Sequence, residues 1–393
     1  MNNKKSIGII TFHEPYSYGA TMQSLSLQMY LKKQGYKAEL IDYSMNGYLQ
    51  LRRIHRFRSG IIKLLRFFYH PITYCKAVIN ARQIAEEKKK VSNRIASRNI
   101  KFKNFRDKYY YKSRCRYENY LDLYNNPPQY DVYMCGSDQI WNPNFCDMDD
   151  SFFLRFANSN KTIAYAPSFG VEKLPIYVKN AYRKRLNGIC FLSVREKSGQ
   201  QIIKELTGKD VPVVVDPTFL VNRSKWAMIA DESTIDTKCP YILSYFIGID
   251  KYIDSFIQML KEVFPEYKII NLVFDKSDYG PEDFLKLIRD SQFVFTNSFH
   301  GLALSLNFRV PFAIGKTLKD YGKSSGFSRI DNLLQQVGLE NRIVEVGEEI
   351  DCSWLNLDFE KVEEKLSCLI SQSTKYLNDS IESIITSTGE INE

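Results

Sequence analysis

Short apolar segments recur along most of the chain. Three of them are SIGIITF near the amino terminus, YDVYMC from Tyr130 to Cys135, and FVFT from Phe293 to Thr296. Their length and composition are typical of strands buried on both faces of a parallel sheet. Longer segments with helical spacing separate them, such as Met22 to Lys33, which ends in basic residues before Gly35. The pattern predicts an α/β fold with parallel sheets.

Small or polar residues follow these predicted strands directly. They are Gly136, Ser137 and Asp138 after Cys135, Arg195 and Glu196 after FLSV, and Asp216 and Thr218 after PVVV, where Val213 to Val215 is the expected strand. The carboxyl ends of parallel strands meet at one rim of a sheet, where open α/β folds bind ligands. Small residues also let a ligand approach the backbone closely. We therefore expect a binding site at this rim.

The segment from Phe293 to Gly315 places a histidine at such a junction. A helix should begin after FVFT, with Asn297 or Ser298 as its cap, and a further strand is expected from Val310 to Ile314. His300 and Gly301 then lie where free backbone amides and the positive helix end attract anions. The alternative is that His300 only caps or packs the helix.

The first strand, loop and helix form a predicted βαβ unit. A turn at Tyr18 and Gly19 should lie at the ligand-facing end of the first strand. The loop lacks GxGxxG spacing, so the sequence does not support a dinucleotide site. His13 and Glu14 could belong to the site or be ordinary loop residues.

Two further places carry candidate polar chemistry. Asp138 could orient a sugar hydroxyl or accept its proton, or it could serve as a helix cap. The polar loop from Tyr321 to Arg329, which includes Lys323, is a candidate anion clamp.

Length and composition indicate a multidomain globular protein. A chain of 393 residues with 44% hydrophobic content favours two or three domains. The composition becomes polar around Asn222 to Lys238, so we expect one Rossmann-like domain over 1–225 and a second over 226–350. A C-terminal helix, about Phe359 to Leu377, should occupy 351–393 and pack back across the domains, before a disordered TSTGEINE end.

Nothing in the sequence indicates export, a membrane span or structural zinc. There is no apolar run of about 18 residues, and MNNKKS lacks the order of a signal peptide. The eight cysteines show no CxxC or Cys/His spacing, which fits reduced thiols. The expected location is the cytoplasm.

Positive charge is concentrated in one segment, from Leu51 to Arg116. It holds 20 Lys and Arg against three acidic residues, a net charge of +17, so the rest of the +9 chain carries −8. The segment belongs to an expected basic helical insertion over about 48–120. Its run LRRIHRFRSGIIKLLRFFYH suits a helix lying on an anionic membrane. RNA is the weaker alternative, because no nucleic-acid motif accompanies the charge; a solvated insertion is the other.

Six stretches, in this order, resemble the polysaccharide pyruvyltransferase family. They are IGIITFHEPYSYGATMQSLSLQMYLKKQGYKAELIDY, YDVYMCGSDQIWNP, TIAYAPSFG, FLSVREKSG, VVVDPTFL and VFTNSFHG. The resemblance covers roughly Ser6 to Val346, apart from the basic insertion. It implies a two-domain fold like that of GT-B glycosyltransferases, with the active site between Rossmann-like halves.

The resemblance also implies an activity. Members of the family transfer pyruvate from phosphoenolpyruvate to a sugar of a bacterial envelope polysaccharide or its lipid-linked precursor, commonly as a cyclic ketal, and no metal or nicotinamide is expected. By position, His300 matches the family's acid/base or donor-binding histidine, and Arg195 matches an arginine implicated in donor binding. Many members have Arg-Leu-His where this chain has Ser298 and Phe299 before the histidine, so one guanidinium is missing.

The chemistry of this donor assigns roles to the candidate residues. Phosphoenolpyruvate carries a carboxylate and a phosphate, which guanidinium groups and helix amides bind well. We expect His300 as acid and Asp138 as base or hydroxyl anchor. The predicted substrate-binding residues are Arg195, Ser298, Gly301, Arg329, Lys323, Gly136, Ser137, Tyr18 and Gly19. Two other functions stay open: a glycosyltransferase using a nucleotide sugar, and a non-catalytic module binding lipid-linked glycans.

Overall fold

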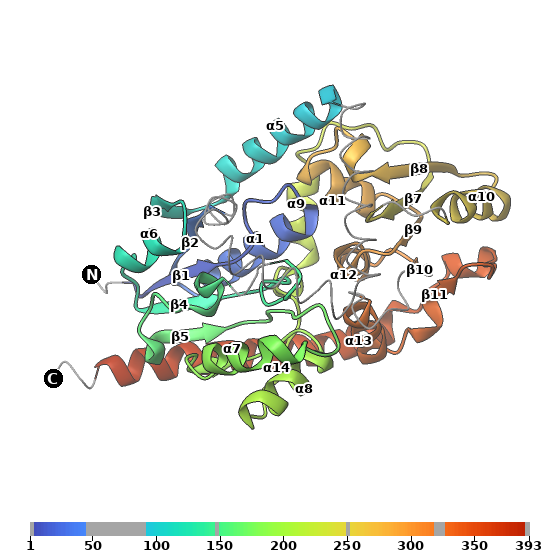
Figure 1. Ribbon diagram of the computed structural model, residues 1–393. Helices are drawn as coiled ribbons and strands as arrows, with labels where there is room; N and C mark the ends of the chain where they lie inside the picture. Colours follow the sequence, from blue (N-terminus) through green and yellow to red (C-terminus); the bar gives the residue numbers. More distant parts are fainter. Residues whose placement is uncertain (1–3, 45–91, 146–148, 249–251, 318–326, 390–393) are drawn as a thin grey trace.

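The computed structural model describes residues 4–44, 92–145, 149–248, 252–317 and 327–389, which form two α/β lobes (Figure 1). Each lobe is built on one parallel sheet flanked by helices. This confirms the predicted fold class, two Rossmann-like domains in a GT-B-like arrangement. The predicted domain boundary at residue 225 falls within α9 (Arg223–Ala230), which lies in the chain between the two sheets.

The N-terminal lobe contains a six-stranded sheet in the order β3-β2-β1-β4-β5-β6. Its strands are β1 (Ser6–Ile10), β2 (Lys37–Tyr43), β3 (Lys112–Tyr117), β4 (Val132–Cys135), β5 (Thr162–Ala164) and β6 (Phe191–Leu192). Its helices are α1 (Tyr18–Lys33), α5 (Ser92–Tyr109), α6 (Tyr120–Asn125), α7 (Ile176–Leu186) and α8 (Lys197–Thr207). Strand order reverses between β1 and β4, which creates a crevice at their carboxyl ends.

The C-terminal lobe contains a five-stranded sheet in the order β11-β10-β9-β7-β8. Its strands are β7 (Tyr241–Phe246), β8 (Lys268–Val273), β9 (Phe293–Thr296), β10 (Phe312–Lys316) and β11 (Ile343–Glu345). Its helices are α10 (Ile253–Val263), α11 (Pro281–Arg289), α12 (Phe299–Phe308), α13 (Ser328–Val337) and α14 (Phe359–Gly389). Here the strand order reverses between β7 and β9, so a second crevice lies at the end of β9.

One cluster of buried apolar side chains extends through both lobes. Tyr18 is central to it and is fully buried. Its ring stacks on Phe284 of α11 at 4.2 Å between centroids, and its hydroxyl donates to the Tyr279 carbonyl at 2.8 Å. The sequence analysis placed Tyr18 and Gly19 in a ligand-facing turn, but Ser17 caps α1 and both residues begin the helix. Tyr18 is therefore corrected from a substrate-binding residue to an interlobe packing residue.

The described part of the basic segment connects the two lobes. In α5, Arg98 donates to the Phe274 carbonyl, and its guanidinium carbon lies 3.8 Å from the Phe274 ring centroid. Lys101 pairs with Asp283 at 2.8 Å. These two cations contact the C-terminal lobe. Residues 45–91, which include the LRRIHRFRSG run, lie outside the described residues, so the membrane hypothesis for them stays a prediction.

Two predicted elements need correction. The insertion predicted over 48–120 is not helical throughout, because Lys112–Tyr117 is β3, a strand with one parallel neighbour, β2, at the sheet edge. Charged side chains on an edge strand face solvent, so the strand lacks an apolar run. Val213 forms only an isolated bridge with Val194, so PVVV is not a regular strand.

Helix α14 packs back across the molecule, as predicted, and runs beneath the N-terminal lobe in Figure 1. Ser373 accepts a hydrogen bond from the Val215 amide at 3.0 Å, and Asn378 accepts one from the Tyr30 hydroxyl at 3.1 Å. The helix is longer than predicted. Residues 386–389 of the expected disordered end are helical, and 390–393 lie outside the described residues.

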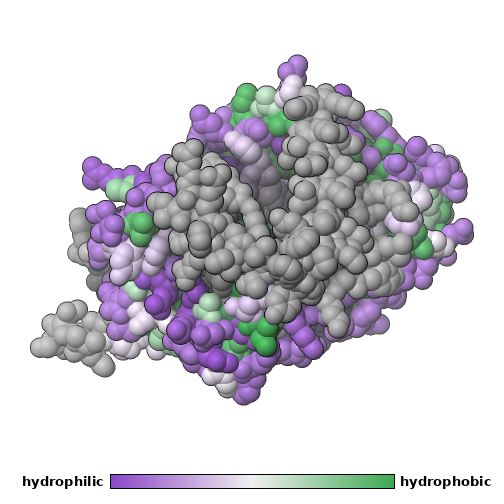
Figure 2. Space-filling view, viewed as in Figure 1, coloured by the Kyte–Doolittle hydropathy of each residue, from purple (hydrophilic) through white to green (hydrophobic). Residues whose placement is uncertain are grey.

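Among the residues that are coloured by hydropathy in Figure 2, most are polar, and the hydrophobic ones form small separate patches. Within the described ranges, none of the helices combines the length and the apolar character that a bilayer crossing would require.

Glu282, in the first turn of α11, gives a pH-dependent test of the lobe contact. Burial raises its pKa to about 7, with Asp283 and Glu232 adding to the effect. Since the folded pKa exceeds the unfolded one, the folded state binds the extra proton, and stability falls as pH rises from about 4.3 to 7. We expect Glu282→Gln to raise the melting temperature at pH 8 but not at pH 4. Glu266→Gln, on the exposed surface, is the control. An equal rise in melting temperature at both pH values would show that the charge of Glu282 is not what destabilises the folded protein.

Candidate active site between the lobes

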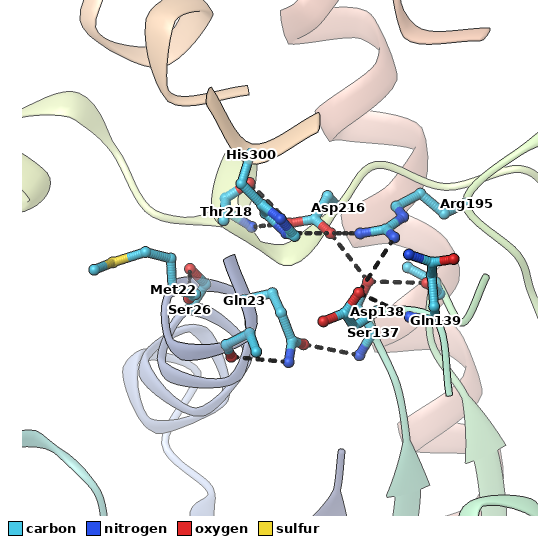
Figure 3. Close-up of polar contacts among 12 residues, drawn as sticks. Met22, Gln23, Ser26, Ser137, Asp138, Gln139, Arg195, Asp216, Thr218 and His300 are labelled. Atoms are coloured by element: carbon cyan, nitrogen blue, oxygen red, sulfur yellow. Dashed lines mark hydrogen bonds and ion pairs between the residues drawn. The ribbon is translucent and has the colours of Figure 1, made fainter. Parts of the chain in front are cut away.

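The two sheet crevices supply one cluster of buried polar side chains (Figure 3). The end of β4 contributes Ser137 and Asp138, and the start of α12, directly after β9, contributes His300. Arg195 and Asp216 follow β6 and the Val194–Val213 bridge. Because these positions are strand ends of parallel sheets, the rim predicted from the sequence is where the groups meet.

Asp216 is the centre of the cluster and is 1% exposed. Its Oδ2 pairs with Nη1 of Arg195, accepts a hydrogen bond from the Ser137 hydroxyl at 3.0 Å, and lies 3.6 Å from Nε2 of His300. Its Oδ1 accepts from the amide and hydroxyl of Thr218 at 3.0 and 2.8 Å. One carboxylate thus holds an arginine of the N-terminal lobe and the histidine of the C-terminal lobe.

Asp216 stays ionised because of these partners. Burial alone would raise its pKa, but the positive charge of Arg195, the His300 imidazole and the Thr218 amide outweigh burial and hold the pKa well below its usual range. Arg195 and His300 therefore have a permanent counter-charge at neutral pH.

Arg195 keeps unused hydrogen-bonding capacity. It is 3% exposed, yet its Nε and Nη2 donate no hydrogen bond to any described residue, and Nη2 lies 3.8 Å from Oδ1 of Asp138. Buried donors without partners cost free energy, so these two N–H groups are candidates for binding a ligand. Nε2 of His300 is likewise buried without a hydrogen bond to the described residues.

A second guanidinium lies nearby. The carbons CZ of Arg195 and Arg329 lie 4.4 and 5.7 Å from the centroid of the Phe299 ring, which also meets the His300 ring edge-on at 5.3 Å. Burial, and then repulsion by Arg195, lower the pKa of Arg329 to about 10. The carboxylates of Asp138, Glu196 and Asp216 act in the opposite direction, so the two guanidinium groups share one charged environment.

Glu196 adds a carboxyl group to the same cluster. It is fully buried, and its Oε1 accepts from the Ser168 hydroxyl at 2.9 Å and the Phe169 amide at 3.0 Å. Burial raises the pKa of Glu196 although Arg195 and Arg329 oppose the shift.

Gly19 is needed for the His300 ring to reach the cluster. A methyl group at position 19 would lie 2.0 Å from Nδ1 of His300. The glycine predicted to approach a ligand therefore accommodates the imidazole of the opposite lobe instead.

Four other predicted residues support the site rather than face it. The Ser298 hydroxyl caps α12 by accepting from the Gly301 amide at 3.2 Å. A Cβ on Gly301 would lie 2.8 Å from Oγ1 of Thr296, and one on Gly136 would lie 2.0 Å from the Tyr165 carbonyl oxygen. Ser137 is fully buried and donates to Ala166 as well as Asp216. These contacts give the four residues packing or positioning roles, and their contact with a substrate stays a prediction.

The remaining candidates lie elsewhere or outside the described residues. Lys323 falls in 318–326, outside the described ranges. His13 and Glu14 belong to a separate cluster: His13 lies 3.4 Å from Asp42, and Glu14 pairs with Arg116 at 2.6 Å. Burial raises the pKa of Asp42, but hydrogen bonds from His13 and Lys112 lower it to about 2.

Sequence reasoning missed three contributors to the site. Asp216 was noted only as a polar residue at a strand end, and no local signal showed that it would pair with His300. Phe299 was noted only for its position before His300, and nothing local showed that two guanidinium groups would approach its ring. Gln23, inside α1, accepts from the Ser137 amide at 3.1 Å and fixes the β4 loop from the first helix.

These features define an α/β protein of GT-B-like fold with a cluster of charged side chains between its lobes. The family model for polysaccharide pyruvyl transferases matches residues 18–314, and the chain therefore belongs to that family. Among curated proteins, none matches the chain.

Several solved structures are similar to the chain at low identity. The UDP-GlcNAc 2-epimerase from Neisseria meningitidis is 12% identical with a TM-score of 0.43, covering 99% of each chain. The epimerase from Methanocaldococcus jannaschii is 11% identical with a TM-score of 0.42, covering 94% of this chain and 93% of that one. The ADP-heptose heptosyltransferase II of E. coli is 12% identical with a TM-score of 0.34, covering 94% and 99%. With TM-scores this low, the chain's own strand order is the firmer basis for its fold.

The contact between Gly19 and His300 can be tested by a double-mutant cycle. Gly19→Ala should lower the free energy of unfolding by about 1–3 kcal/mol, because the added methyl group must displace the ring. In a His300→Ala background the same change should be neutral or stabilising, since alanine favours helix. Urea denaturation of the four proteins measures the coupling. An equal cost in both backgrounds would show that position 19 does not contact the ring.

Asp216→Asn tests the buried counter-charge. We expect it to lower the free energy of unfolding by about 3–5 kcal/mol, since it leaves Arg195 buried without its partner. The folded pKa of Asp216 is depressed, so the loss should persist from neutral pH down to about pH 4. Asp231→Asn, in the exposed pair with Arg289, is the matched control and should cost at most about 1 kcal/mol. Equal losses would contradict the central role of Asp216.

Proposed function

We propose that this protein transfers pyruvate from phosphoenolpyruvate to a sugar of a bacterial cell-surface polysaccharide, or to its lipid-linked precursor, as a ketal. The observation that carries the proposal is the placement of two guanidinium groups, of Arg195 and Arg329, around the Phe299 ring beside His300. Nε and Nη2 of the buried Arg195 donate no hydrogen bond to the described residues. A donor with a carboxylate and a phosphate needs cations at two points. Family membership supplies the reaction class.

Arg329 is our candidate for the guanidinium that many family members carry two residues before the histidine. Ser298 occupies that position here, and its side chain caps α12. Arg329 approaches from α13 and reaches the ring of Phe299, the residue between Ser298 and His300. The cation would thus come from a different helix and serve the same anion.

The reaction needs proton transfers that the cluster can perform. The methylene carbon of the donor takes one proton and becomes a methyl group, while two sugar hydroxyl oxygens bond to the neighbouring carbon. The bond from that carbon to the phosphate oxygen breaks, and phosphate leaves with its electron pair and the second hydroxyl proton. In this proposal His300 delivers the first proton, and Asp138, 13% exposed at its side chain, receives or orients a hydroxyl.

The same proposal includes the setting of the reaction. The chain would need no metal or nicotinamide, since proton transfer and anion binding suffice for these steps. It would act in the cytoplasm or at the inner face of the cell membrane, where lipid-linked precursors are available. Its partners would be the donor and the sugar acceptor, with an anionic membrane surface as a further contact.

Phosphate release in the presence of phosphoenolpyruvate and candidate acceptors tests the proposal. His300→Asn should reduce the rate by about 10²–10⁴-fold while leaving the circular dichroism spectrum unchanged, because a proton donor is lost. Near-normal rates would remove His300 from the mechanism.

Arg329→Ala should raise the KM for phosphoenolpyruvate by about tenfold to a hundredfold, the value of one or two charged hydrogen bonds. Arg309→Ala, which removes an exposed arginine paired with Glu363, is the matched control and should leave KM unchanged. An unchanged KM in Arg329→Ala would show that another group binds the donor.

Thermal protection separates the alternative functions. Phosphoenolpyruvate should raise the melting temperature of the full chain, and the rise should grow with the ratio of its concentration to its dissociation constant. Protection by a nucleotide sugar alone would favour a glycosyltransferase. Binding of a lipid-linked glycan without phosphate release would favour a non-catalytic module.

A further inference from the structure

A groove of about 490 Å³ lies away from the interlobe cluster. It is formed by the last turns of α1, by Tyr109 and Tyr111 before β3, and by Leu220 to Met228 at the start of α9. The α1 wall of the groove, Gln28 to Lys33, follows Gly19 by 9 to 14 residues and so lies roughly 14–21 Å from it along the helix axis. None of the charged side chains of the interlobe cluster lines the groove. The proposed transfer reaction therefore belongs to the cluster, and the groove would have a separate role.

The floor and rim of the groove are largely apolar. Met29, Leu220 and Val221 line it. Two large apolar side chains at its rim, Tyr111 and Met228, are 57% and 60% exposed. Exposed apolar groups gathered at one concave place indicate a binding surface more often than scattered ones do.

The charged side chains of the groove are all cations. Lys32, Lys33 and Lys225 line it, and no carboxylate does. Lys32 lies over the Tyr111 ring, with Nζ 2.9 Å from its centroid. Glu232 is the neighbouring acid that acts on Lys225, and it is paired with Lys108 at 2.6 Å. Within the described residues, Lys33 and Lys225 form no ion pair.

We propose that this groove binds the headgroup and first methylenes of an anionic phospholipid at a membrane surface. The lysines would contact the phosphate, the apolar floor would cover the methylenes, and Tyr111 and Met228 would enter the interface. A simple anion would leave the floor uncovered, and a neutral apolar ligand would leave three cations without a counter-charge. The volume lies within the range of ligand sites, but the open rim suits a molecule that continues into a bilayer.

Methyl NMR of the full chain, labelled at methionine, maps the site with dihexanoylphosphatidylglycerol below its micelle concentration. The signals of Met29 and Met228 should shift, while that of Met134, in the core, should not. Dihexanoylphosphatidylcholine and inorganic phosphate should each cause much smaller shifts. Absence of a shift at Met228 with the anionic lipid would overturn the proposal.

Vesicle binding then identifies the source of the ligand. The double variant Lys33→Gln/Lys225→Gln should weaken binding to vesicles containing phosphatidylglycerol by about tenfold or more. The control pair Lys184→Gln/Lys209→Gln, exposed on the α7 and α8 side, should change it little. Equal vesicle binding by the two double variants would contradict the proposal that the groove binds a membrane phospholipid. If the soluble lipid still shifted the Met228 signal, the groove would instead bind a soluble amphiphile.

Discussion

The carboxylate of Asp216 is the interaction on which the rest of the site depends. It is buried, it remains ionised, and it links a guanidinium of one lobe to an imidazole of the other. Removing a carboxylate from water is costly, and the cost is met here by the Thr218 and Ser137 hydrogen bonds together with Arg195. The position of His300 relative to Arg195 therefore follows from one shared anion.

Close packing against helix α1 also fixes the position of the His300 ring and of the loop after β4. Gly19 leaves room for the His300 ring, and Gln23, one turn further along α1, holds the β4 loop through the Ser137 amide. A single helix of the N-terminal lobe thus positions both halves of the cluster. Arg195 and Arg329 near Phe299 then supply positive charge at two points.

The local pattern of apolar and polar residues was sufficient to predict the two-domain α/β architecture. FVFT is β9 with the expected bounds, and α1 ends at Lys33 as its basic last turn indicated, because burial on both faces and helix termini leave local signals. Partners distant in sequence leave none. The pairing of Asp216 with His300, the stacking of Tyr18 on Phe284, and the approach of Arg329 to Phe299 arise only when the lobes meet. The polar strand β3 was missed because edge strands tolerate charge.

The apolar cluster that runs through both lobes has a consequence for how the protein folds. Tyr18 has its ring in the opposite lobe, and Arg98 and Lys101 of α5 attach there as well. Two sheets joined this way bury part of each lobe's apolar surface against the other lobe. Cutting the chain near α9 would expose to solvent the apolar side chains that each half buries against the other, so neither fragment is suited to separate expression.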